Sequence, residues 1–215
     1  NWVNLNGLWD YQITNKDAPK PNRYKGKILV PYPLESALSG VKKALLPNQN
    51  LWYRRTIDYI QNSTNRVMLN FGAVDWQATV YVNGHQVGTH QGGYTAFSFD
   101  ITKELKNGSN EIIVKVFDPS DQGIGPHGKQ VLSPANIYYT PSSGIWQTVW
   151  METVPKAYVN DLTITPDIDK SLVLIKVNSA SAMEVELLAD GKTVNGRTNS
   201  EISIPITNAK LWSPS

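Results

Sequence analysis

The stretch GAVDWQATVYVNGHQVGTHQGGYTAFSFDIT, residues 72–102, carries the clearest secondary-structure signal in the chain. Strand-like segments lie on both sides of Asn83-Gly84 in its middle. A type I′ turn needs positive φ at both central residues, and Asn-Gly meets that need. We therefore predict a β-hairpin that turns at Asn83-Gly84. A carboxylate and a large aromatic side chain, Asp75 and Trp76, come directly before its first strand.

Short strand-like runs continue on both sides of this hairpin, and helical periodicity is almost absent. Residues 51–59 alternate with a period of two, which predicts a strand with one buried face. Residues 110–118 are almost continuously apolar and are predicted to form a central strand. Residues 144–154 are predicted to form one further strand. The irregular segment between them, residues 119–143, is long enough to indicate a functional or mobile loop.

A domain boundary is predicted at Pro155. Beyond it the chain has fewer aromatic residues, and short strands follow at even spacing with a hairpin turn at Asp190-Gly191. This pattern is typical of an immunoglobulin-like sandwich. The predicted fold class is therefore all-β. Residues 1–154 form a jelly-roll β-sandwich of the galactose-binding type, and residues 155–215 form a small or partial immunoglobulin-like β-sandwich.

The composition excludes several classes of function. The 20 basic and 18 acidic residues give a net charge of +2 without a long basic run, which argues against nucleic acid as a partner. No apolar stretch approaches the roughly 20 residues that cross a bilayer. Without cysteine there is no disulfide, thiolate zinc site or thiol catalysis. His85 and His90 are expected on the surface rather than in a metal site, and we expect neither metal nor cofactor.

Several segments together resemble the N-terminal part of glycoside hydrolase family 2, the family of β-galactosidases, β-glucuronidases and β-mannosidases. They follow the family's order over most of residues 5–155. The segments are LNGLWDYQI, ILVPYPLESALSG, LWYRRTI, LNFGAVDWQATVYVNGHQVG, GGYTAFSFDIT, NEIIVKVFDP and SSGIWQTVWMETVP. LWSP, residues 211–214, is similar to the end of the family's second domain. The resemblance implies a sugar-binding jelly roll, an immunoglobulin-like sandwich, and a TIM barrel that performs retaining β-glycoside hydrolysis.

No catalytic residue is predicted within these 215 residues. A TIM barrel needs about 250 residues and alternating helices, and the chain offers neither. We therefore expect both catalytic Glu residues to be absent. The family's acid/base Glu follows an Asn, but we interpret Asn110-Glu111 as a loop-end Asn and an exposed Glu at a strand edge. No serine lies in a nucleophile-elbow pattern.

The resemblance does imply a substrate-binding role for four residues. In the family, the loop that matches GAVDW approaches the active-site mouth, which makes Asp75 a candidate sugar ligand and Trp76 a candidate stacking surface. Alternatively, Asp75 caps a turn and Trp76 packs beneath it. His127 and Tyr138, in the long loop, are candidates for a second wall. That loop can instead be a domain contact, partly disordered without its partner.

Other polar and aromatic residues are interpreted as structural. Arg54 and Arg55 are expected to pair with carboxylates across a sheet rather than bind acidic sugars. Glu35 is expected to anchor an apolar turn through hydrogen bonds. Core packing or interdomain contact is predicted for four tryptophans. These are Trp9, Trp52, Trp146 and Trp150.

Three functions remain open from the sequence. The first is the non-catalytic N-terminal region of a retaining β-glycosidase, which shapes the glycone pocket. The second is a free-standing carbohydrate-binding module or lectin, and the third is an adhesion or scaffold protein. The first implies a β-glycoside ligand, the missing TIM barrel as partner, and a possible homo-oligomer. Family analogy alone favours a periplasmic or secreted location.

Overall fold

The computed structural model describes residues 2–61, 64–189 and 191–214. The chain divides into two compact units, Asn1–Thr153 and Val154–Ser215. Regular structure in the described ranges is β-strand, apart from two short 3-10 helices, η1 (Ala37–Ser39) and η2 (Ser120–Gln122). The predicted all-β fold is confirmed. None of the helices in these ranges has the length and apolar character that a membrane span requires.

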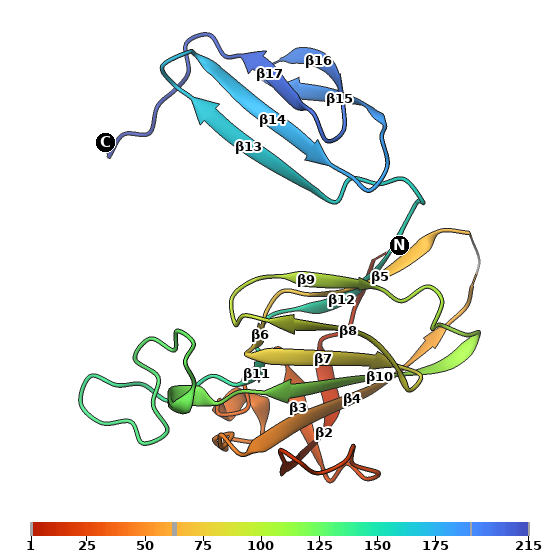
Figure 1. Cartoon of the computed structure of the whole chain (residues 1–215), viewed down its shortest axis with the longest axis vertical. Helices are drawn as coiled ribbons and strands as arrows, with labels where there is room; N and C mark the ends of the chain where they lie inside the picture. The colour runs from red at the N-terminus through yellow and green to blue at the C-terminus, as the bar shows by residue number, and fades with distance from the viewer. Residues whose placement is uncertain (1, 62–63, 190, 215) are drawn as a thin grey trace. The chain divides into compact units, whose positions relative to one another are not determined.

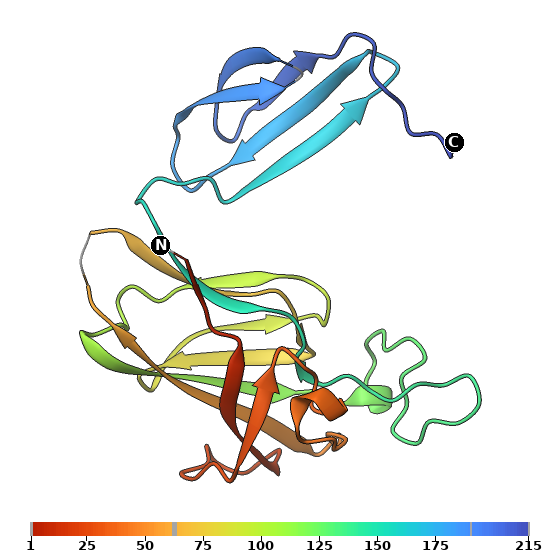
Figure 2. The same ribbon diagram turned by 180° about the vertical axis from the view of Figure 1, so that it is seen from behind.

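The first unit is a sandwich of two antiparallel sheets (Figure 1; Figure 2 from behind). One sheet has the order β3-β2-β4-β10-β7-β8 and the other β1-β12-β5-β9. The first comprises β2 (Gly7–Asn15), β3 (Gly26–Val30), β4 (Gln49–Tyr59), β7 (Gln77–Val82), β8 (His85–Gln91) and β10 (Gly108–Phe117). The second comprises β1 (Trp2–Asn4), β5 (Arg66–Phe71), β9 (Phe97–Asp100) and β12 (Val149–Val154). Both sheets send apolar side chains into one core, which includes Trp9, Tyr53, Val80, Val114, Leu69, Phe71 and Val149.

The predicted hairpin is confirmed in β7 and β8. Val82 pairs with His85, which leaves Asn83 and Gly84 as the two turn residues. Their φ angles are 49° and 86°, as a type I′ turn requires. The Asn83 side chain also donates to the main-chain oxygen of Glu104. The turn is thereby bonded to the chain that leads into β10.

The prediction of one buried face for residues 51–59 is wrong at the start of β4. Leu51, Trp52 and Tyr53 are all buried, so both faces are covered there. The Trp52 indole stacks on Tyr81, with ring centroids 6.5 Å apart, and its Nε1 donates to Thr14 Oγ1 at 3.0 Å. β4 lies between β2 and β10. Aromatic side chains of the sheet therefore cover the face that periodicity assigned to solvent. β10 is central, as predicted.

Residues 144–154 form two strands rather than the predicted single strand. β11 (Gly144–Ile145) pairs with β6 (Val74–Asp75), whereas β12 pairs with β1. The chain must leave the small β6–β11 pair to enter the four-stranded sheet, so it bends between the two strands. This small pair positions Asp75 beside the end of β10.

The second unit contains two small antiparallel sheets. Its strands are β13 (Asp161–Asp167), β14 (Leu172–Asn178), β15 (Glu184–Ala189), β16 (Lys192–Arg197) and β17 (Glu201–Pro205). Ile175, Val177 and Ile204 form a small core, as expected for a small immunoglobulin-like sandwich. In the predicted Asp190-Gly191 turn, Asp190 lies outside the described residues. Gly191 has φ +71°, and the flanking β15 and β16 pair as a hairpin.

Candidate functional site

A cavity of about 300 Å³ lies where β6, the end of β10 and the loop of residues 119–143 meet. Figure 1 shows this loop, in green to cyan, projecting beyond the strands of the first unit. Asp75, Trp76 and His127 all line the cavity, although 52 positions separate the first from the last. The full lining is Asp75, Trp76, Phe117, Asp118, Pro119, Ser120, Gln122, Gly123, Ile124, Gly125, Pro126, His127 and Gln130. Tyr138 is absent from this lining and is 48% exposed.

Asp75 provides a half-buried carboxylate at one wall. The strand β6 holds it through pairing with Gly144, and the Asp75–Trp76 peptide bond is cis. Gly93 packs directly on the carboxylate, because a Cβ at position 93 would lie 2.7 Å from Asp75 Cγ. No hydrogen bond to the Asp75 carboxylate is formed within the described ranges, so it does not act as a turn cap there.

The surroundings of Asp75 favour its neutral form. Burial, together with the smaller effects of the nearby carboxyl groups of Asp118 and Glu35, raises the pKa of Asp75 from 3.8 to about 7. Half of the Asp75 carboxyl groups are therefore ionised near neutral pH. Asp75 can then act as a hydrogen-bond acceptor when ionised and as a donor when protonated.

A buried hydrogen-bond network supports the cavity from behind. Asp118 accepts a bond from Ser120 N at 2.8 Å and from Ser143 Oγ at 2.6 Å. Ser143 N donates to Glu35 Oε2 at 2.8 Å, and Leu45 N donates to Glu35 Oε1 at 3.3 Å. The prediction that Glu35 anchors its turn is confirmed. Burial raises the pKa of both Asp118 and Glu35, while these hydrogen bonds oppose the shift. Asp118 and Ser143 were not singled out in the sequence.

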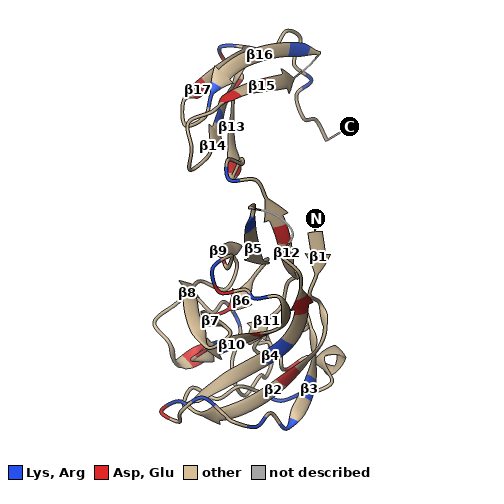
Figure 3. Ribbon diagram, turned by 90° about the vertical axis from the view of Figure 1, so that its right-hand side faces the viewer, with Lys and Arg blue, Asp and Glu red and all other residues tan. Residues whose placement is uncertain are grey.

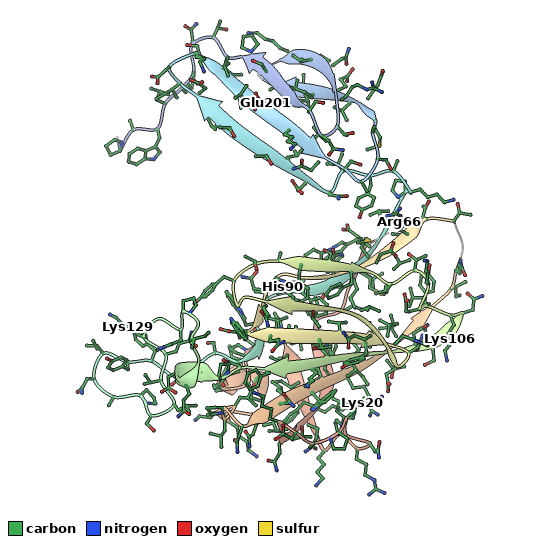
Figure 4. The ribbon with its side chains drawn as sticks, in the orientation of Figure 1. Lys20, Arg66, His90, Lys106, Lys129 and Glu201 are labelled. Carbon is green, nitrogen blue, oxygen red and sulfur yellow. The ribbon has the colours of Figure 1, made fainter. Side chains whose placement is uncertain are left out.

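The long loop forms the opposite wall and is held by bonds within itself. His127 Nδ1 lies 3.1 Å from Gln130 O, and the Asp121 carboxylate accepts from Leu132 N at 3.1 Å. Gln130 also forms an isolated bridge with Tyr139. The label of Lys129 in Figure 4 marks this part of the loop. The predicted second wall thus contains His127 at the cavity, whereas Tyr138 lies outside it.

Two aromatic groups flank Asp75. On the cavity side, Gly125 of the loop lies against the Trp76 indole, where a Cβ would be 3.7 Å from Nε1. On the other side, Trp146 Nε1 donates to Gly93 O at 2.7 Å. The Trp146 ring meets the exposed ring of Tyr94 edge to face, at 5.7 Å between centroids. Trp146 therefore packs beside the site and not in the central core.

The sequence of this sandwich decides its family. Residues 27–155 match the family described as Glycosyl hydrolases family 2, sugar binding domain. The chain belongs to glycoside hydrolase family 2. The resemblance stated from the sequence motifs is confirmed.

The relatives of this chain include proteins named as β-glucuronidases and as β-galactosidases. A putative β-glucuronidase of Formosa agariphila is 32% identical over 154 residues, covering 71% of this chain and 16% of that protein. A β-galactosidase of Thermoanaerobacter pseudethanolicus is 31% identical over 154 residues, covering 70% of this chain and 20% of that protein. A solved Bifidobacterium dentium β-glucuronidase, complexed with coumarin-3-O-glucuronide, has a TM-score of 0.67 at 22% identity; the alignment covers 100% of this chain and 43% of that one. This chain therefore spans less than half the length of these relatives.

The Asn110-Glu111 pair has the residue order of the family's acid/base motif, but Asn110 has a structural role here. Asn110 is buried within the central strand β10, where its amide bonds Asn83, Lys106 and Gly108. The interpretation of Asn110-Glu111 as a loop end and strand edge is therefore wrong, because β4 and β7 flank β10 on both sides. The described part of the chain contains no group of three or more His, Cys, Asp or Glu residues that could hold a metal ion.

The two arginines of β4 differ from each other. Arg54 pairs with Asp10 across β2 and β4 at 2.8 Å, as predicted, and Figure 3 shows acidic and basic segments side by side in these strands. Arg55 instead donates to the main-chain oxygens of Leu5 and Asn6, at 2.7 and 3.0 Å. The prediction of a carboxylate partner for Arg55 is therefore wrong, because its guanidinium donates to main-chain oxygens of the segment that leads into β2.

Trp9, His85 and His90 are absent from the cavity lining. Trp9 is fully buried and its Nε1 donates to Leu5 O at 2.8 Å, so the core role predicted for it is confirmed. His90, labelled on β8 in Figure 4, stacks on Phe97 at 4.1 Å. His85 is exposed at the hairpin turn, as predicted.

Proposed function

We propose that this chain is the non-catalytic N-terminal region of a retaining β-glycosidase and that its first unit supplies one side of the glycone pocket. The observation that carries the proposal is the Asp75 carboxylate. It is half-buried beside Trp76 in a 300 Å³ cavity and has no hydrogen-bond partner among the described residues. A carboxylate held in this way is suited to bind a ligand hydroxyl.

Each of three cavity residues would make a different contact with the sugar. The Asp75 carboxylate would accept hydrogen bonds from sugar hydroxyl groups. The Trp76 indole would cover the apolar C–H face of a pyranose ring. His127 would offer Nε2, because its Nδ1 faces Gln130 O. These groups bind and orient a sugar, and they exclude water from one side of it.

The bond-breaking chemistry would belong to other residues. Retaining hydrolysis needs two carboxyl groups about 5 Å apart, one as nucleophile and one as acid/base. Asp75 and Asp118 both line the cavity, but the Asp118 carboxylate is already bonded to Ser120 N and Ser143 Oγ. We therefore assign binding to this chain, and catalysis to a barrel that would face the cavity in the complete enzyme.

The test uses the complete product of the gene that encodes these residues. Asp75→Ala and Trp76→Ala should each lower kcat/KM for aryl β-glycosides by about 10- to 100-fold, as expected when one transition-state contact is lost. Tyr139→Ala is the matched control, since Tyr139 is an exposed aromatic in the same loop but outside the cavity lining. Equal losses in all three variants would show that the cavity is not the sugar site.

A carbohydrate-binding module remains the second candidate, because every residue lining the cavity lies in the first unit. Calorimetric titration of residues 1–215 with galactose, glucuronic acid and mannose separates the two functions. Heat that disappears in Asp75→Ala would favour the binding module. If residues 1–215 are folded but give no heat with any sugar, and the complete gene product cleaves glycosides, the first unit supplies only one wall of the pocket.

A further inference from the structure

We propose that the sugar held in this cavity is a neutral hexose and not a uronic acid. This inference rests on the proposed function and names the substrate class of the same site. The names of the relatives leave the question open, because they include both β-glucuronidases and β-galactosidases. The charge and hydrogen-bonding capacity of the cavity distinguish the two classes.

The cavity wall is acidic. Its described lining contains the carboxyl groups of Asp75 and Asp118 and includes neither Lys nor Arg. Glu35 adds a third carboxyl group behind the wall, joined to Asp118 through Ser143. A uronate carboxylate in this cavity would meet like charges, and proteins normally bind such groups with Arg, Lys or several N–H donors.

Two lysines adjacent to cavity residues, Lys16 and Lys129, do not line the cavity. Lys16 Nζ lies over the ring of Phe117, 3.9 Å from its centroid, and lines a different pocket. Lys129 belongs to the long loop but not to the cavity lining. Within the lining, His127 alone has a side chain that can become positive. One imidazole facing two carboxyl groups does not make the site attractive to an anion.

An unpaired carboxylate at the cavity wall points to a ligand that donates hydrogen bonds. Ser120 lines the cavity, but its hydroxyl oxygen is buried without a hydrogen-bond partner in the described structure and does not itself face a ligand. The Asp75 carboxylate is likewise unbonded there. Buried polar groups in proteins are normally paired, so the half-buried Asp75 carboxylate favours a hydrogen-bonding occupant. A sugar hydroxyl can donate a hydrogen bond to the ionised Asp75, whereas the C6 carboxylate of a uronate can only accept one.

The experiment compares two substrates that differ at C6 in carrying a carboxylate, and also in the configuration at C4. The complete gene product is assayed with 4-nitrophenyl β-galactoside and 4-nitrophenyl β-glucuronide at pH 8, with 4-nitrophenyl β-glucoside to separate the C4 effect. We expect kcat/KM for the better neutral substrate to exceed that for the glucuronide at least about tenfold. Asp75→Asn should reduce this ratio, because it removes one charge without changing the shape of the side chain.

A matched control and the opposing outcomes complete the design. Asp58→Asn removes an exposed charge on β4, away from the cavity, and should leave the ratio unchanged. A preference for the glucuronide, or a ratio that Asp75→Asn does not alter, would overturn the inference. If no glycoside is cleaved, the proposed function fails. Calorimetry with galactose, glucose and glucuronate then decides: heat with a neutral sugar alone supports a neutral ligand, and any other result overturns it.

Discussion

Asp75→Asn should stabilise the protein at alkaline pH but have much less effect at acidic pH. Burial and two neighbouring carboxyl groups raise the pKa of Asp75 from 3.8 to about 7 in the folded state. Between these values the folded state binds more protons than the unfolded state, so stability falls as pH rises. The contribution of protonated Asp75 to the free energy of unfolding is fully present below pH 3.8 and is lost above about pH 7. Asparagine keeps the shape of the side chain and removes this dependence.

The magnitude follows from the pKa difference. A change from 3.8 to about 7 corresponds to about 4 kcal/mol between the acidic and alkaline limits. Because the carboxylate is partly open to solvent through the cavity, we expect roughly half of this. The stability gained by Asp75→Asn should therefore be larger at pH 8 than at pH 4.5 by roughly 2 kcal/mol.

Urea unfolding of residues 1–215 at both pH values measures this difference, with tryptophan fluorescence as the signal. Asp58→Asn serves as the control, since it removes an exposed aspartate from β4 and should have a similar effect at both pH values. An Asp75→Asn effect that is equal at the two pH values would refute the reasoning. So would a variant that is less stable than the wild type at pH 8.

Three further substitutions test the framework of the site. Ser143→Ala removes the hydroxyl that donates to Asp118 and should lower the unfolding free energy by about 1–3 kcal/mol, measured by urea denaturation; no loss would show that the bond is not needed. Gly144→Ala should cost about 3 kcal/mol or more, because φ is +92° and the new Cβ would collide with the Tyr53 hydroxyl. A Tyr53→Phe background should recover part of that loss in thermal unfolding, and the absence of recovery would argue against the collision. Asn110→Ala should cost about 2–3 kcal/mol in the same assay, because several buried hydrogen bonds are lost, whereas a neutral result would contradict its structural role.

The sequence predicted those parts of the fold that depend on neighbouring residues. The Asn83-Gly84 turn is correct because its requirement for positive φ is local. The second buried face of Trp52 could not be predicted, because Tyr81 covers it from another strand. The break after Ile145 was missed for a similar reason. Its cause is a change of strand partner, which leaves no mark in the alternation of residues.

The candidate site could be predicted only in part. Asp75 and Trp76 were identified through a family motif, and the fold brings His127 to the same cavity. Tyr138 was expected beside them but lies outside the lining. Ser143 was missed because its carboxylate partner, Asp118, is 25 positions away. Contacts of such separation depend on the path of the whole chain and not on any local pattern.

The two walls of the cavity differ in how they are tied to the rest of the protein. Asp75 is fixed by β6, by Gly93 and by the hydrogen-bonded framework around Ser143. Between its two ends, the loop of residues 119–143 is held mostly by hydrogen bonds within the loop, such as that between His127 and Gln130. Changes of length or sequence in a surface loop cost little folding free energy. Under the proposed function, changes in the loop would alter ligand preference while the carboxylate keeps its position, so we propose residues 119–143 as the target for engineering new sugar specificity.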